Sequence, residues 1–159
     1  MKNILLVVDL QPEFKDKDGR YEKILEFVKT SKSKYEYVIA TVFENEEGSN
    51  FVKYLNWSGC MPPIKELDFD ADVVISKSCY GLMDDFEYYF LIDGHSSDTY
   101  HYDIIGFDTD SCVLKVALDL FDRGYDINVL TDYCYSSEGL DRHNLGITML
   151  KNLCGSVVK

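Results

Sequence analysis

Short apolar runs alternate with longer amphipathic stretches along the whole chain. The apolar runs are typical of strands buried on both faces of a parallel sheet, and they cover residues 2–9, 35–42, 72–76, 102–105, 126–131 and 156–158. The stretches with three-and-four spacing of apolar residues predict helices over 21–30, 81–93, 112–123 and 140–152. The alternation predicts one domain over 1–159, an α/β fold with three layers (α-β-α) and a doubly wound, mainly parallel six-stranded sheet of Rossmann-like topology.

Two segments depart from this alternation. Residues 43–63 begin as a charged loop, allow one or two helical turns at 51–55, and then contain Gly and Pro residues that stop a helix. We expect this segment to be a surface excursion that can fold over a site. Residues 94–101 are polar and turn-like, and the pattern assigns them no role.

Composition and short motifs disfavour several classes of function and of location. The formal net charge is -12, which opposes binding to nucleic acid or to an anionic membrane, because both depend on Lys and Arg contacts.

The 5 Cys are an odd number with no C-x-x-C pair, which predicts reduced thiols and a cytoplasmic location. No apolar run approaches the length of a signal-peptide core or a membrane span. No glycine-rich phosphate-binding motif follows the first strand, which disfavours a nucleotide site.

Three reactive residues follow strands or begin a helix at the same edge of the predicted sheet. Asp9 ends the first strand, Lys77 directly follows the third, and Cys112 begins the helix after the fourth. Ligand sites of such sheets lie at the carboxyl ends of the strands. A helix N-terminus and a nearby ammonium favour a thiolate, and a carboxylate can accept a thiol proton. Each residue also has an ordinary reading, as a turn residue, a solvated charge or a core cysteine. Their joint placement predicts a nucleophile, a base and an electrostatic partner.

The chain resembles the isochorismatase-like cysteine hydrolases, which include nicotinamidases and N-carbamoylsarcosine amidase. The resemblance lies in L-L-V-V-D-L-Q-P-E-F at 5–14, I-S-K-S-C-Y-G at 75–81, G-F-D-T-D-S-C-V at 106–113 and L-T-D-Y-C-Y-S at 130–136. It implies a catalytic triad of Asp9, Lys77 and Cys112. It also implies a cis peptide at Phe107-Asp108 and an oxyanion hole formed by the backbone N–H groups of Asp108 and Cys112.

The function that the resemblance implies is hydrolysis of a non-peptide C–N bond in a small amide, ureide or related compound through a thioester. It further implies a homo-oligomer, a dimer or a tetramer. Two other classes stay open: a catalytically idle interaction or redox-sensing protein, and a flavodoxin-like cofactor carrier. Thiol titration would separate the first of these from an enzyme, and a coloured ligand would mark the second.

The chain also departs from the metal-binding nicotinamidases. After the second strand they carry Asp-x-His and further His residues, whereas this chain reads V-F-E-N-E-E-G-S-N-F, and its 3 His lie elsewhere. We therefore expect no metal and no cofactor. Several aromatic residues near the predicted edge are candidates for a substrate pocket: Phe14, Phe43, Trp57, Tyr80 and Tyr133.

Overall fold

The computed structural model describes residues 2–15, 17–82 and 99–159. Within them, five parallel strands form one sheet in the order β3-β2-β1-β4-β5. The strands are β1 (Lys2–Val8), β2 (Tyr37–Phe43), β3 (Val73–Lys77), β4 (Tyr100–Phe107) and β5 (Asp126–Tyr135). The α-helices are α1 (Arg20–Ser31), α2 (Asn50–Leu55), α4 (Cys112–Asp122) and α5 (Leu140–Cys154).

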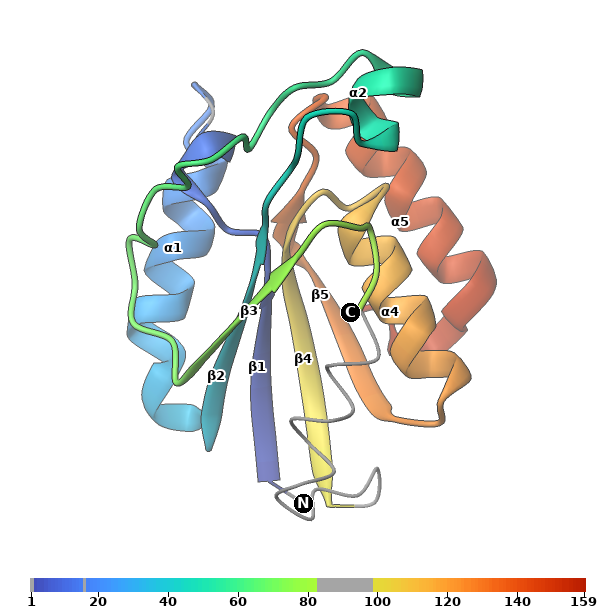
Figure 1. The fold of residues 1–159 in the computed structure, drawn as a ribbon. Helices are drawn as coiled ribbons and strands as arrows, with labels where there is room; N and C mark the ends of the chain where they lie inside the picture. Colours follow the sequence, from blue (N-terminus) through green and yellow to red (C-terminus); the bar gives the residue numbers. More distant parts are fainter. Residues whose placement is uncertain (1, 16, 83–98) are drawn as a thin grey trace.

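The central strand is buried on both faces, as its continuous apolar run predicts. Ile4, Leu6 and Val8 face a core shared with α4 and α5. Leu5 and Val7 face the opposite core, which α1 covers. Figure 1 shows α1 on one side of the sheet and α4 with α5 on the other. The expected three-layer α/β fold with a parallel sheet is therefore confirmed.

The prediction of a sixth strand over 156–158 is wrong. Residues Gly155–Val157 form a 3₁₀ turn after α5, and only Val158 forms a bridge, with Val129 of β5. Gly155 has a φ of 61°, so the chain turns sharply at the point where the strand would begin. The apolar residues of this segment pack against the sheet without extending it.

Most other elements lie within a few residues of their expected bounds. β5 is longer than expected and contains a register shift opposite Ile104 and Gly106. Beyond Leu82, the expected helix over 81–93 lies outside the described residues. Residues 94–98 lie outside them as well. No helix in the described part of the chain is long and apolar enough to cross a membrane.

Candidate active site

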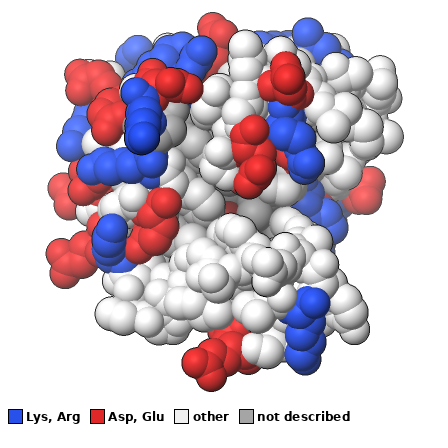
Figure 2. All heavy atoms as spheres, turned by 90° about the horizontal axis from the view of Figure 1, so that it is seen from above, with Lys and Arg blue, Asp and Glu red and all other residues white. Residues whose placement is uncertain are grey.

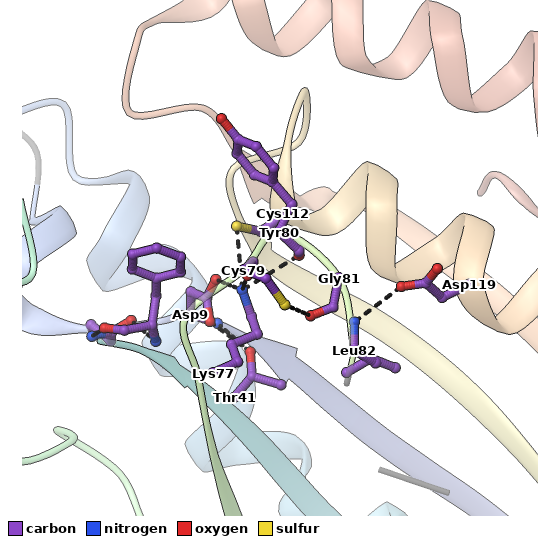
Figure 3. Close-up of polar contacts among 11 residues, drawn as sticks. Asp9, Thr41, Lys77, Cys79, Tyr80, Gly81, Leu82, Cys112 and Asp119 are labelled. Carbon is purple, nitrogen blue, oxygen red and sulfur yellow. Dashed lines mark hydrogen bonds and ion pairs between the residues drawn. The ribbon is translucent and has the colours of Figure 1, made fainter. Parts of the chain in front are cut away.

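The carboxyl edge of the sheet brings Asp9, Lys77 and Cys112 into direct contact (Figure 3). Asp9 follows β1, Lys77 is the last residue of β3, and Cys112 is the first residue of α4. The Lys77 Nζ lies 2.7 Å from Asp9 Oδ2 and 3.4 Å from Cys112 Sγ. The three residues that the sequence assigned to one edge therefore form one connected cluster.

The Asp9–Lys77 ion pair is buried, and neighbouring groups support both partners. Each side chain is only 1% exposed. Thr41 Oγ1 donates to Asp9 Oδ1 at 2.6 Å, and Lys77 donates to the carbonyl oxygens of Cys79 and Tyr80. A buried ion pair is tolerated only when such additional bonds satisfy its donors and acceptors. These contacts hold the ammonium at a fixed point beside the sulfur.

Burial and neighbouring charges shift the pKa values of Lys77 and Cys112. Burial lowers the pKa of Lys77, but the charges of Asp9 and Cys112 outweigh it, so the net shift is upward and the side chain stays an ammonium. Burial raises the pKa of the Cys112 thiol, the Asp9 carboxylate raises it further, and Lys77 opposes both. Desolvation therefore works against the thiolate that the helix N-terminus and the nearby ammonium favour.

The turn before Cys112 leaves two backbone donors available. The Phe107–Asp108 peptide is cis, the form that the family resemblance implied. Ser111 and Val113 donate their N–H groups to the Asp108 carbonyl oxygen. In the described part of the chain, the N–H groups of Asp108 and Cys112 have no backbone acceptor. The first N–H groups of a helix lack an intrahelical acceptor, which makes them suitable donors to an anion.

Helix α5 packs closely onto this turn. Thr109 Oγ1 and His143 Nδ1 are 2.8 Å apart, and Arg142 binds Asp110 Oδ2. A Cβ on Gly146 would lie 2.7 Å from the Thr109 carbonyl oxygen, so only glycine permits this approach. These contacts hold the turn before Cys112 against α5.

A cavity of about 340 Å³ opens above Cys112. Four of the five predicted pocket residues line it: Phe14, Phe43, Trp57 and Tyr80. Its remaining lining comes from α2, from the two turns after β4 and β5, and from α5: Phe51, Leu55, Asp108, Asp110, Ser111, Ser137, Glu138 and Arg142. The segment 43–63 thus forms one wall of the cavity that contains the sulfur.

Comparison with known proteins decides the family. The sequence model of the Isochorismatase domain matches residues 3–159. This chain belongs to the isochorismatase family. Isochorismatase domain-containing protein 2A of Mus musculus is 31% identical over 84 residues, which are 53% of this chain and 39% of that protein. The chain therefore matches less than half of that relative's length.

Solved structures share the isochorismatase fold. The nicotinamidase PncA of Bacillus subtilis superposes with a TM-score of 0.78 at 19% identity, covering 99% of both chains. A pyrazinamidase of Pyrococcus horikoshii in complex with zinc superposes with a TM-score of 0.76 at 21% identity, covering 100% of this chain and 98% of the other. At this level of identity the likeness establishes the fold alone.

Zinc does not fit the described residues of this isochorismatase-family chain. They contain no group of three His, Cys, Asp or Glu side chains placed to hold a metal. Asn45, in the segment after β2, uses its side-chain amide to bind the carbonyl oxygens of Trp57 and Gly59, and its oxygen accepts from Glu46 and Ser49. A larger hollow of about 630 Å³ lies along this segment, but Cys112 does not line it.

Tyr133 is the one predicted pocket residue that the structure places elsewhere. Its ring stacks on Phe27 of α1 at 3.8 Å, and it is not part of the cavity lining. Side chains alternate along a strand, so Tyr133 shares the α1 face with Tyr135, whereas Cys134 faces the α4 core. The strand continues through these residues, which the shorter predicted strand did not include.

Sequence reasoning missed several lining residues, above all Phe51, Asp110 and Arg142. The sequence could have indicated Phe51 as a lining residue, because it is an aromatic residue within the expected helical turns at 51–55. The Asp110–Arg142 pair joins residues 32 positions apart, and nothing local marks it. Gln11 was also missed: it bonds both the N–H and the carbonyl oxygen of Phe43, which ties the end of β1 to the end of β2.

Proposed function

We propose that this chain is a cysteine-dependent hydrolase that cleaves the C–N bond of a small amide, ureide or related compound through a thioester on Cys112. One observation carries the proposal: a single buried ammonium, Lys77, contacts both the Asp9 carboxylate and the Cys112 sulfur beneath the cavity. A carboxyl group and a thiol held together by one ammonium form the arrangement that general-base activation of a nucleophile requires.

In the first half-reaction, Cys112 Sγ attacks the substrate carbonyl carbon while Asp9 takes the thiol proton. The carbonyl oxygen becomes an oxyanion, and the N–H groups of Asp108 and Cys112 are the candidate donors that stabilise it. When the intermediate collapses, the C–N bond breaks and Asp9 returns the proton to the leaving nitrogen. Ammonia or an amine departs, and a thioester remains on Cys112.

In the second half-reaction, water attacks the thioester carbon. Asp9 again accepts a proton, now from the water, and passes it to the departing sulfur. The products are the carboxylic or carbamic acid and the resting thiol. Lys77 supports both steps, because its positive charge stabilises negative charge developing on the sulfur.

The names of the structural neighbours support amide hydrolysis as the reaction class, since nicotinamidases and pyrazinamidases are named for it. The idle redox-sensing alternative has less support. Redox-sensing cysteines have a low pKa and are accessible, whereas Cys112 is buried and its pKa is raised. The five cysteines are free thiols, which supports a reducing compartment such as the cytoplasm.

The test is a panel of small primary amides and ureides with ammonia detection, run on the wild type and on Cys112→Ser. Rapid acid quench followed by mass spectrometry should find an acyl group on the peptide containing Cys112. The proposal expects ammonia release that depends on Cys112 together with that adduct. Ammonia release that persists in Cys112→Ser would overturn the nucleophile assignment, and no release from any amide would favour the idle protein.

A further inference from the structure

The cavity above Cys112 has one wall built from aromatic rings. Phe43 and Phe51 have ring centroids 4.9 Å apart, Phe51 and Tyr80 also 4.9 Å, and Phe43 and Trp57 5.6 Å. All four rings line the cavity. Such a wall offers a substrate apolar area and the negative faces of its π systems, to which cations are attracted.

The turns after β4 and β5 contribute acidic groups to the same cavity. Asp108, Asp110 and Glu138 contribute three carboxyl groups, and Arg142 is the single cation in the lining. Arg142 is already engaged, because its Nε and Nη2 both lie 2.7 Å from Asp110 Oδ2. The Lys77–Asp9 ion pair beneath the cavity adds no net charge, since the two groups neutralise each other.

One acceptor in this lining has no donor. The Asp110 side chain is only 6% exposed, and its Oδ1 is a buried atom without a hydrogen-bond partner among the described residues. Buried polar atoms without a partner are rare and costly. Asp108, by contrast, accepts from the N–H and the hydroxyl of Ser137. Because Asp110 Oδ1 is not exposed to the cavity, Asp110 acts on a bound molecule through its charge and not through a direct hydrogen bond from this atom.

We propose that the cavity selects small amides or ureides that carry a cationic nitrogen group beyond the bond to be cleaved, and that it disfavours anionic ones. This inference rests on the proposed function for the reaction and names the substrate class. The cationic group lies between the aromatic wall and the carboxyl groups of Asp108, Asp110 and Glu138.

Charge, rather than size, is the selecting property. The carboxyl edge seen from above carries a broad uncharged area flanked by acidic and basic groups (Figure 2). A neutral amide of the same shape would gain the same contact with the rings but no attraction to the carboxylates. An anionic amide would be repelled by the excess of negative charge in the lining, where three carboxyl groups stand beside one arginine.

The first experiment compares three primary amides of equal chain length: 4-aminobutanamide, pentanamide and glutaramate, which are cationic, neutral and anionic at neutral pH. We expect kcat/KM to fall by at least about tenfold at each step in that order, a factor that corresponds to about 1.4 kcal/mol. Glu138→Gln should reduce the cationic preference. Glu26→Gln removes the same charge on the exposed surface of α1, and it should leave the preference unchanged.

The second experiment does not depend on turnover. Methanethiosulfonate reagents carrying a trimethylammonium or a sulfonate group react with thiols, and the modified Cys112 peptide can be quantified by mass spectrometry. Relative to their rates with free 2-mercaptoethanol, the cationic reagent should modify Cys112 at least tenfold faster than the anionic one. Cys112→Ala supplies the background from the other thiols, including the partly exposed Cys79.

The two readouts separate the two hypotheses. If no amide is hydrolysed but the cationic reagent is favoured, the proposed function fails and the charge selectivity of the cavity stands. If amides are hydrolysed while the charge series is flat or reversed, the proposed function stands and the inference is overturned. Equal rates for both reagents at Cys112 would overturn it as well.

Discussion

Replacing Lys77 by Met tests whether its ammonium controls the reactivity of Cys112. Methionine keeps a similar length but removes the charge 3.4 Å from the sulfur. At an effective dielectric constant of about 20, two unit charges at that distance attract by about 5 kcal/mol. The wild-type thiolate has this stabilisation, and the thiolate of the variant does not.

The loss of attraction converts only partly into a slower reaction. A less stable thiolate is a stronger nucleophile. With a Brønsted coefficient of about 0.5, this greater nucleophilicity offsets roughly half of the lost stabilisation of the thiolate. About 2.5 kcal/mol remains, which lowers the alkylation rate at neutral pH by about 50- to 100-fold. Asp9→Asn should act in the opposite direction, because it removes the carboxylate that raises the pKa of Cys112.

The assay is the rate of iodoacetamide reaction at Cys112 between pH 7 and 9.5, measured beside turnover of one amide. Lys77→Met should slow both reactions. Asp9→Asn should speed alkylation and lower turnover by at least about 100-fold, because it deletes the general base. Lys29→Met, on the exposed surface of α1, is the matched control and should change neither rate.

Stability needs a separate check, because each single variant leaves a buried charge without its partner. Either one should lower the free energy of unfolding by about 3–5 kcal/mol. The double variant Asp9→Asn with Lys77→Met removes both charges and should be less destabilised than the sum of the two. An alkylation profile that does not move in a folded Lys77→Met protein would refute the electrostatic role of Lys77.

Four further outcomes are expected. Cys112→Ala should fold with a melting temperature close to that of the wild type and lose turnover, and unchanged kinetics would end the nucleophile assignment. Activity should survive dialysis against a strong chelator, and stoichiometric metal lost together with activity would contradict this. Gly106→Ala should cost at least about 3 kcal/mol of stability in denaturant unfolding, because Gly106 has a φ of +123° and its Cβ would lie 2.0 Å from a carbonyl oxygen of β1. Gly124→Ala, with a φ of +75° and nothing within 4 Å, is its milder control. We also propose a homo-oligomer that uses the exposed apolar stripe of α5, so Leu145→Glu with Met149→Glu should lower the mass measured by light scattering, and a wild-type monomer would refute it.

The expected and observed sites agree where local pattern and sheet geometry suffice. A buried apolar run that ends in a polar residue marks the carboxyl end of a parallel strand, and such ends meet at one edge. That reasoning was enough to bring Asp9, Lys77 and Cys112 together. It could not give the desolvation that raises the pKa of Cys112, because a helix N-terminus is visible in the sequence while the depth of burial is not.

The sequence by itself determined the alternation of elements, the order of the reactive residues and most of the aromatic candidates, since each depends on neighbours within a few positions. Only the tertiary structure decided which groups share the cavity. The Asp110–Arg142 pair joins the start of one helix to the start of another. Tyr133 turned to the α1 face because β5 continues past its expected end. Desolvation and side-chain pairing depend on segments far apart in the chain, and these segments meet only when the sheet and its helices have packed.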